Sequence, residues 1–477
     1  MSVPPTCDRP LAHAKSDSGP PARPVLILAT CILSSSLAFV DGSVVNVGLP
    51  AIGADLHGSA FDLQWVINAY LLPLSALLLL GGALGDRFGR RRILILGIAL
   101  FALASAGCAA AARLDWLFAA RGIQGLGAAL LLPSSLAILG ASFEGEARSK
   151  AVGLWAASSA ISGALGPVLG GFLIDSVGWR AIFLINLPLA AAAIGLALYA
   201  VPARHPAKDT AHLDVVGAAL ATAALAGLSW SLTVASGDKG WSLTSILVAL
   251  VSLALSAAFI WQERRLGERA MTPLALFGSR RLVGLNLLTL LLYGALGGFL
   301  LLLPYRLIEA SHYTATAAAA CLLPFPIIMS VGAPLTGTLA GKIGSRPLLV
   351  AGCILVSAAF ALIAFMAPAA PYWTSVLPSI VVMAVGMSCA AAPLTSAVLS
   401  SVDAKHTGSA SGLNSAVARA GGLFVVSLLG AVLAAKGDAL VAAFRTAAFA
   451  GAGLCLLAGM AGLILIGDDR PKSAPKR

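Results

Sequence analysis

The amino-acid sequence predicts an all-α polytopic membrane protein, and three observations lead to this fold class. Hydrophobic residues make up 59% of the 477 residues, charged residues make up 11%, and the mean hydropathy is +0.93. Soluble domains carry about 25% charged residues, so this composition points to a membrane protein. The apolar residues also fall in runs of the roughly 20 residues that an α-helix needs to cross a bilayer. Strands of a membrane β-barrel need about ten residues of alternating character, which these runs do not match.

Counting the apolar runs between polar segments gives fourteen predicted membrane-spanning helices. Their approximate limits are 25–46, 62–84, 93–112, 116–140, 149–174, 179–201, 214–235, 243–262, 282–304, 315–341, 347–367, 372–398, 410–435 and 440–466. Residues 1–24 are rich in Pro, Ser and charge and are predicted to form a disordered tail, with a second polar tail at 467–477. Six of the seven cysteines lie inside apolar runs, where a thiol behaves as a small hydrophobe.

The distribution of basic residues predicts that both termini are cytoplasmic. With fourteen spans and a cytoplasmic N-terminus, 23 of the 31 Lys and Arg residues fall in cytoplasmic segments and six lie on the outer side or at the outer edge of a span. Lys and Arg accumulate in the cytoplasmic loops of membrane proteins. The net charge of +11 therefore reflects topology and contact with anionic inner-leaflet lipid, and it does not indicate nucleic-acid binding.

A glycine-rich, charged segment occurs twice in the chain. GGALGDRFGRRRIL, residues 81–94, links the second and third spans, and a weaker copy 255 residues later, GTLAGKIGSRPLLV at 337–350, links the tenth and eleventh. The second copy has Gly341 in place of Asp86. Internal repeats are the usual construction of secondary transporters. The expected organisation is an N-terminal six-helix half at 25–202, two inserted helices with cytoplasmic loops at 203–280, and a C-terminal six-helix half at 281–466.

Five motifs occur in order along the chain, and together they resemble the fourteen-helix drug:proton antiporters of the major facilitator superfamily. The five are FVDGSVVNVGLP at 39–50, the charged loop at 82–94, RGIQGLGAALLLPSSLAIL at 121–139, GALGPVLGGFL at 163–173 and WRAIFLINLP at 179–188. The fourth departs from the family's antiporter motif by one residue in its first spacing. The resemblance covers nearly the whole chain. It implies a fold of two six-helix bundles plus two inserted helices, and a proton-coupled efflux transporter of the bacterial inner membrane working by alternating access.

The residue types of the charged loop and of the fifth-helix motif suggest physical roles, and the resemblance implies more specific ones. Glycines let helix ends approach closely and turn tightly, while arginines hold a loop at the lipid headgroups. In the family the loop acts as a latch that stabilises the outward-facing state, which implies this role for Gly82, Asp86, Arg87, Gly89, Arg90 and Arg91. The fifth-helix motif implies a closely packed hinge at Gly163, Gly166, Pro167, Gly170 and Gly171. Topological anchoring of the loop and simple close packing of the helix are the plainer alternatives.

Charges inside the predicted spans are the strongest chemical signal. Asp41, Arg121 and Arg419 stand out, and each is costly in a bilayer unless it is paired or faces water. Burial disfavours a carboxylate and a cationic neighbour favours it, so Asp41 is the predicted proton carrier and Arg121 its partner, which the resemblance also implies. Asn46, Gln124 and Arg419 are predicted to line the cavity. The alternatives are a structural pair at a helix end for Asp41, and an Arg419 side chain that reaches back to the cytoplasmic interface.

Other classes of function fit the sequence poorly. The P-loop pattern of ATP-driven transporters does not occur, and the six histidines are dispersed outside the spans without a metal-ligand pair. We therefore expect no enzymatic activity, no cofactor, no metal and no nucleic-acid partner. The expected partners are a small-molecule substrate, protons and the lipid bilayer. A periplasmic adaptor, export of one endogenous metabolite or antibiotic, and a membrane sensor that transports nothing are left open.

Overall fold

The computed structural model describes residues 23–467, apart from 204–212, 238–239, 268–269, 271–277, 368–370 and 403–406. The described residues form α-helices joined by short turns, with no β-strand among them. The helices are α1 Pro24–Asp55, α2 Ala60–Phe88, α3 Arg90–Ala109, α4 Leu114–Ser142, α5 Gly145–Ser176, α6 Ala181–Leu184, α7 Asn186–Ala200, α8 Val215–Ala235, α9 Leu243–Leu266, α10 Arg280–Ser311, α11 Ala315–Ala320, α12 Pro324–Ile343, α13 Ser345–Ala364, α14 Tyr372–Ser375, α15 Leu377–Ser400, α16 Thr407–Ser427, α17 Gly430–Ala434 and α18 Gly437–Leu465. The predicted tails lie almost entirely outside the described residues, as do most of the loops predicted around the inserted pair.

Thirteen helical segments in the described part of the chain are long and apolar enough to cross a membrane. They coincide with thirteen of the fourteen predicted spans. The other predicted span, 410–435, is α16 followed by the short helix α17. It is less apolar because α16 carries Asn414, Ser415 and Arg419. The first span is longer than predicted, since α1 continues past residue 46 to Asp55.

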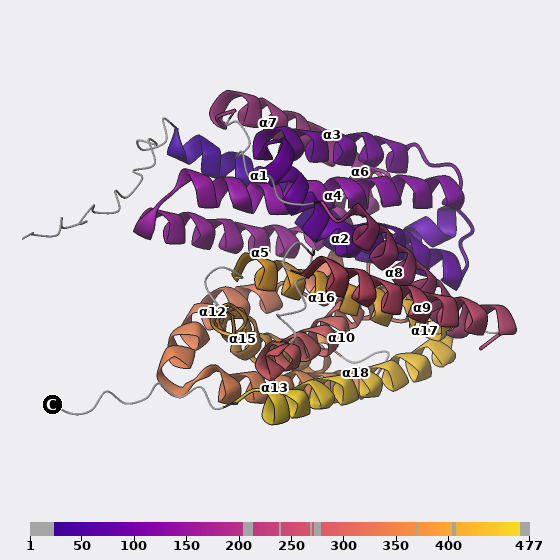
Figure 1. Ribbon diagram of the computed structural model, residues 1–477. Coiled ribbons are helices and arrows are strands. Elements are labelled where there is room, and N and C mark those ends of the chain that lie inside the picture. The colour runs from indigo at the N-terminus through magenta and orange to yellow at the C-terminus, as the bar shows by residue number, and fades with distance from the viewer. Residues whose placement is uncertain are drawn as a thin grey trace, which may run out of the picture.

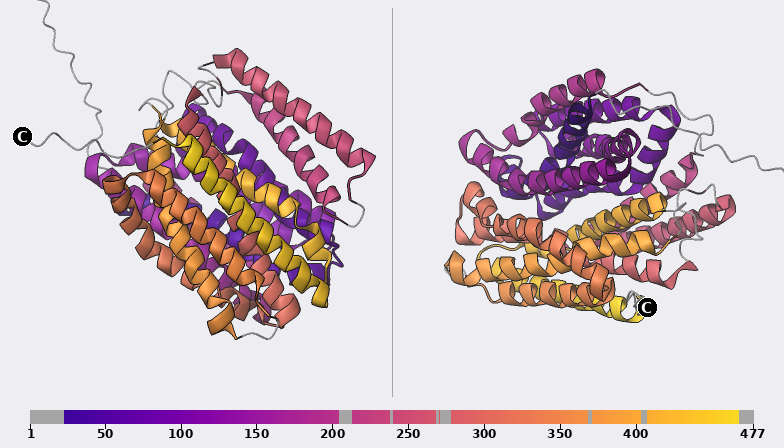
Figure 2. Two further views of the ribbon diagram at one scale, coloured as in Figure 1. Left: turned by 90° about the horizontal axis from the view of Figure 1, so that it is seen from below. Right: turned by 90° about the vertical axis from the view of Figure 1, so that its left-hand side faces the viewer.

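The helices form two bundles with a helix pair at their side. Helices α1 to α7 pack mainly against one another, and α10 to α18 form the second bundle (Figure 1). Helices α8 and α9 pair with each other, and α8 also contacts α2 of the first bundle and α16 of the second. The pair stands out at one edge of the molecule (Figure 2). The inserted pair therefore touches both bundles, although α8 makes all the main contacts.

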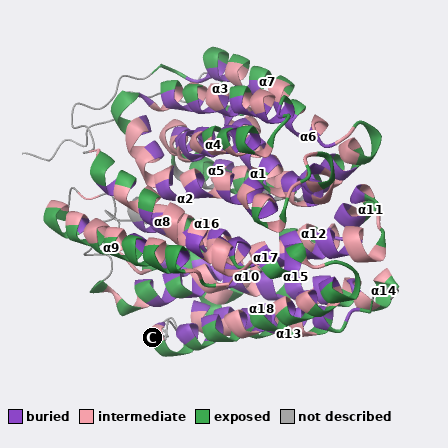
Figure 3. Ribbon diagram, turned by 90° about the vertical axis from the view of Figure 1, so that its right-hand side faces the viewer, coloured by how far each residue is buried: buried purple, intermediate pink, exposed green. Residues whose placement is uncertain are grey.

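The outer surfaces of the helices are apolar, as expected for chains in contact with lipid. Helix α9 exposes large aliphatic side chains along its length, among them Leu247, Leu250 and Leu253, and much of it is exposed in Figure 3. In a soluble protein such a patch would be a site of association. Around a membrane bundle it is the surface that lipid tails cover.

The two bundles repeat the same local geometry at the two copies of the charged segment. Gly89 ends α2 and begins α3 with φ of 100°, and Gly344 does the same between α12 and α13 with φ of 89°. Residues other than glycine rarely adopt such positive φ values. Inside each bundle a glycine pair then brings two helix backbones together, Gly97 with Gly127 and Gly352 with Gly386. These turns explain why glycine interrupts the charged segment.

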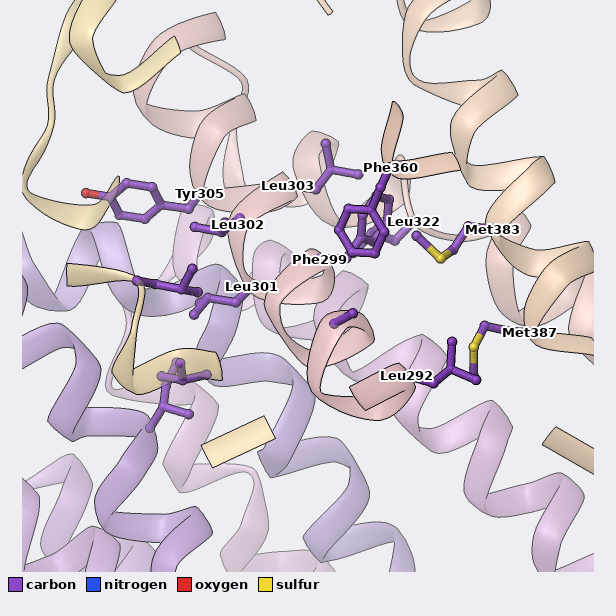
Figure 4. Packing of buried hydrophobic residues seen from close by; sticks show 14 of the residues in the cluster. Leu292, Phe299, Leu301, Leu302, Leu303, Tyr305, Leu322, Phe360, Met383 and Met387 are labelled. Carbon is purple, nitrogen blue, oxygen red and sulfur yellow. The ribbon is translucent and has the colours of Figure 1, made fainter. Parts of the chain in front are cut away.

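The core of the second bundle is built from apolar side chains of α10, α13 and α15. Phe299 and Phe360 pack edge to face with ring centroids 5.5 Å apart (Figure 4). Beside them lies a cavity of about 390 Å³ that α10, α13, α16, α17 and α18 surround. Its lining is apolar apart from Thr446, so it lacks the convergent polar groups of a specific binding site.

Candidate functional site

Asp41 lies in the middle of α1 and is fully buried. It is the eighteenth of the 32 residues of that helix, and its exposed fraction is 0%. The backbone groups around it are satisfied within the helix, so its carboxylate needs partners from other helices. A structural pair at a helix end, the plainer alternative for this residue, does not fit its position.

Helices α4 and α7 supply partners for both carboxylate oxygens. Arg121 donates from Nη1 to Oδ2 of Asp41 at 2.5 Å. Gln124, one helical turn further along α4, donates from Nε2 to Oδ1 at 2.7 Å. Asn186, at the start of α7, donates from Nδ2 to the same oxygen at 3.3 Å. Three helices that are distant in sequence therefore meet at one carboxylate.

Arg121 is held by more than its ion pair. Its Nε donates to the carbonyl of Val66 at 3.1 Å, and its Nη1 also donates to Oε1 of Gln124 at 2.7 Å. Its guanidinium lies over the ring of Tyr70, 4.4 Å from the centroid, and that tyrosine donates to the carbonyl of Ala38. The side chain of Arg121 is 1% exposed. Hydrogen bonds and ring contact together fix its orientation toward Asp41.

Sequence reasoning did not assign Ser105 and Asn186 to this site. Ser105 of α3 accepts hydrogen bonds from Gln124 at 2.9 Å and from Asn186 at 3.3 Å. Both residues are fully buried. In the sequence, each of the two is a polar residue inside an apolar run: Ser105 in the third span and Asn186 in the WRAIFLINLP motif. Sequence alone did not show that these positions face the same point as Asp41.

This arrangement suits a group that changes its charge. Removing one partner from a buried ion pair leaves an uncompensated charge and costs about 3–5 kcal/mol, so Asp41 and Arg121 depend on each other. Neither is accessible to water in this conformation. Water therefore reaches Asp41 only if the helices around it move.

Two other predicted cavity residues lie apart from this network. Asn46 and Arg419 are half-buried, and neither makes a hydrogen bond or ion pair with the residues that the structure describes. Within the same described ranges, His, Cys, Asp and Glu nowhere gather into a group of three that could hold a metal ion.

The charged turn at 82–94 is fastened to its own bundle. Asp86 pairs with Arg90 at 2.8 Å, with side chains 49% and 39% exposed. Arg90 also donates to the carbonyl of Ala137 on α4 at 3.0 Å, and Arg91 donates to that of Leu198 on α7 at 2.8 Å. Arg87 lies against the ring of Phe88. The turn thus connects the ends of four helices of the first bundle.

We predict that Asp86→Asn and Arg90→Ala slow transport several-fold and leave substrate affinity nearly unchanged. Exposed ion pairs contribute about 1 kcal/mol or less, so the fold should persist while the balance between conformations shifts. Binding and initial transport rates of both variants, measured on the same preparations, check this. Rates equal to wild type, or weaker binding with unchanged cycling, would contradict it.

The glycines of the fifth-helix motif face two different neighbours. A side chain at Gly166 or Gly170 would collide with Ser43 or Val44 of α1, within the first bundle. A side chain at Gly171 would come within 2.7 Å of the backbone of Ala315 and Thr316, at the start of α11 in the second bundle. Pro167 is buried beside them, whereas a Cβ added at Gly163 would have no neighbour within 4 Å. Close approach between the bundles therefore depends on Gly171.

Asp175 fastens the bundles at the same end. Its carboxylate accepts hydrogen bonds from the backbone N–H of Ala315 at 3.1 Å and of Thr316 at 2.9 Å, and from the Thr316 hydroxyl at 2.6 Å. These are free N–H groups of the first turn of α11, where negative charge is stabilising. Sequence reasoning did not single out Asp175.

A second fastening lies between α2 and α16. Gln64 donates to the carbonyls of Val426 and Ser427 at 2.8 and 2.9 Å, and Asn68 donates to the hydroxyl of Ser427 at 2.9 Å. Ser229 of the inserted helix α8 joins them with a 2.7 Å hydrogen bond to Ser427. Gln64 and Asn68 lie in the part of α2 near its first residue, at the end of the molecule where α5 ends and α11 begins. Both fastenings therefore close the same end.

Comparison with known proteins shows which family this chain resembles. The chain matches the family model of the Major Facilitator Superfamily over residues 31–426, with a second match over residues 285–477. It is 34% identical over 415 residues to the methylenomycin A resistance protein of Bacillus subtilis, covering 86% of this chain and 87% of that protein. It is 32% identical over 436 residues to the tetracenomycin C resistance and export protein of Streptomyces glaucescens, covering 90% and 80%.

A third relative and two solved structures also resemble this chain. The multidrug resistance protein Stp of Mycobacterium tuberculosis is 32% identical over 414 residues, covering 86% of this chain and 76% of that protein. A bacterial homolog of the human lysosomal transporter Spinster, solved in an inward-facing and unoccupied conformation, matches with a TM-score of 0.65 at 17% identity, covering 96% of this chain and all of that one. The nucleoside transporter NupG matches with a TM-score of 0.64 at 16% identity, covering 93% and 100%. These two structures support the fold.

Proposed function

The chain belongs to the Major Facilitator Superfamily, and from this premise we propose that it is a proton-coupled antiporter exporting small lipophilic compounds. It is a multi-pass transporter of the bacterial inner membrane and not an enzyme. The names of its relatives support export, since they describe resistance to, or export of, drugs and antibiotics.

The observation that carries the coupling proposal is the buried network around Asp41. Among charged residues in the described helix interiors, Asp41 is the acid that lies far from a helix end, and Arg121 needs its charge. A carboxylate can gain and lose a proton during transport, whereas an arginine stays protonated. The proton enters from the outer side, neutralises Asp41 and leaves toward the cytoplasm in exchange for substrate.

Asn186 can accept a hydrogen bond from Asp41 once the carboxyl group has taken up the proton. Its Oδ1 is buried and accepts no hydrogen bond from the described residues, while its Nδ2 donates to Asp41. When Asp41 is protonated, rotation of the amide places Oδ1 where it accepts the new O–H. Arg121 then keeps Gln124 and the Val66 carbonyl as partners.

The two fastenings support a working model of alternating access. With both termini cytoplasmic, the end that Asp175 and Gln64 close is the outer side, so the described conformation faces the cytoplasm. Opening outward would break the capping of α11 and the seam between α2 and α16, and the charged turn would then latch the inner side.

The topology on which this orientation depends has its own test. We predict fourteen spans, with α16 and α17 forming one of them and both termini in the cytoplasm, because basic residues accumulate on that side. A reporter that is active only in the cytoplasm, fused after Arg477, should be active. Activity from a reporter that works only outside the cytoplasm would reverse the orientation.

Export itself is tested by resistance. Expression in an efflux-deficient bacterium should raise resistance to some toxic compounds, and collapse of the proton gradient should remove the effect. Resistance to one antibiotic alone would favour the second candidate, a dedicated exporter of a single endogenous compound. The relative from Streptomyces glaucescens, named for tetracenomycin C, makes that candidate specific. No gain of resistance across a broad panel would contradict export.

A further inference from the structure

Arg419 lies deep within α16, on the boundary between the two bundles. It is the thirteenth residue of that helix, about 18 Å along its axis at roughly 1.5 Å per residue. Gly412 and Val426, two turns to either side, mark the face of α16 that meets α2: a side chain at Gly412 would meet Leu79, and the Val426 carbonyl accepts from Gln64. Arg419 shares this face.

Tyr70 of α2, across this boundary, is close enough to Arg419 for the two side chains to interact electrostatically. The Arg121 guanidinium lies over the ring of the same tyrosine. Tyr70 thus interacts both with Arg419 and with the arginine of the buried pair. Arg419 is therefore near the coupling network without being part of it.

Arg419 differs from Arg121 in having no partner among the residues that the structure describes. It makes no hydrogen bond, ion pair or ring stack with any residue in the described ranges, and it is half-buried. The described interiors of α2, α8, α10, α15 and α16 contain no Asp or Glu away from the helix ends. Asp41, the nearest interior acid, is already occupied by Arg121.

The charges in the interior therefore do not balance. Asp41 offsets Arg121, whereas no acid in the described helix interiors offsets Arg419. An uncompensated charge inside a bilayer protein is costly unless it serves a pathway or a ligand. A bound anion removes this cost, and the planar guanidinium can bind a carboxylate with two parallel hydrogen bonds.

We propose that Arg419 binds the anionic group of the exported compound, and that the preferred substrates are lipophilic anions such as aromatic carboxylates. This inference rests on the proposed export function and adds the class of substrate. The apolar walls of the bundles take the lipophilic part of the molecule. Tyr70 places the bound anion next to the network in which Asp41 changes its charge.

The test compares matched compounds that differ in charge alone. Binding of naphthoate and naphthamide, of biphenylcarboxylate and its amide, and of dansylglycine and its amide is measured on purified wild-type protein by thermal shift and by fluorescence. The variants are Arg419→Gln, Arg419→Lys, and Arg445→Gln as a control at an exposed arginine of α18. Melting temperatures of the unliganded variants show whether each one is folded.

We expect the wild type to prefer the carboxylate of at least one pair. A hydrogen-bonded charge pair is worth about tenfold to hundredfold in affinity, so Arg419→Gln should lose the preference by that factor. Arg419→Lys should retain part of it, and Arg445→Gln all of it. Equal binding of acid and amide by the wild type, no binding of any carboxylate, or an unchanged preference in folded Arg419→Gln would overturn the proposal.

Resistance measurements distinguish a failure of this inference from a failure of the proposed export function. If wild type and Arg419→Gln raise resistance equally to anionic compounds as well as to neutral or cationic ones, export stands and anion binding is wrong. If wild type exports nothing under a proton gradient, the proposed function fails first.

Discussion

Asp41→Asn protein in proteoliposomes is expected to exchange substrate across the membrane but not to concentrate it under an imposed pH gradient. The asparagine imitates the protonated carboxyl group and keeps an oxygen for Gln124 and Asn186 to donate to. Without a group that releases a proton, the gradient has no means of driving substrate uphill. Uptake against a gradient and counterflow at equal concentrations, measured on the same vesicles, distinguish the two activities.

This variant also leaves Arg121 without its counter-charge, so loss of pumping needs a structural control. Breaking a buried pair costs about 3–5 kcal/mol, and removing both charges is often far less harmful. The double variant Asp41→Asn with Arg121→Gln should therefore recover stability without recovering pumping. If the double variant pumps, or if Asp41→Asn alone pumps fully, Asp41 is structural and the proton path lies elsewhere.

Gly171→Val is expected to stop transport by preventing closure of the outer side. A side chain there comes within 2.7 Å of the backbone of Ala315 and Thr316, which cannot move away as a flexible side chain would. Overpacking of this kind costs about 1–3 kcal/mol, which shifts a conformational equilibrium by about 5- to 150-fold. The outward-facing state lacks this contact and should accumulate.

Labelling with a membrane-impermeant maleimide measures that shift. Ala319→Cys, in a background without native cysteines, is a suitable reporter because Ala319 is 1% exposed and packs with Ala315 and Val47 at the closed end of the molecule, which is the outer side in the proposed orientation. Labelling should be faster in the Gly171→Val background. Gly153→Val, on the same helix with no neighbour within 4 Å, is the matched control and should label at the wild-type rate. Equal labelling of both would show that Gly171 does not control closure.

Much of the fold followed from composition and spacing, because a bilayer leaves few choices for an apolar segment of 20 residues. The exceptions have physical causes. Helix α1 extends to Asp55 because Pro50 and the two glycines near it, which suggest a helix end in the sequence, are accommodated inside the helix. Helix α16 carries Asn414 and Arg419, whose polarity is compatible with a position between the bundles rather than against lipid.

The candidate site was predictable only in part. Asp41 and Arg121 stood out because a charge in an apolar run is rare and costly. Ser105, Asn186 and Asp175 did not, because Ser and Asn are tolerated in such runs, and Asp175 looked like an ordinary acid at a helix end. Their roles depend on contacts between segments 81 to 145 residues apart in the chain, such as Asn186 with Ser105 and with Asp41. A single sequence carries no record of such contacts.

The central claim is that Asp41 carries the proton that substrate displaces, and proton release on binding tests it most directly. Purified protein in weakly buffered detergent solution, at a series of pH values, receives a compound identified by the resistance screen while a pH indicator records released protons. Binding and proton release are linked, so wild type should release protons as substrate saturates it, and Asp41→Asn should bind with little release. Substrate binding without proton release by wild type across the accessible pH range, or equal release by Asp41→Asn, would contradict the claim.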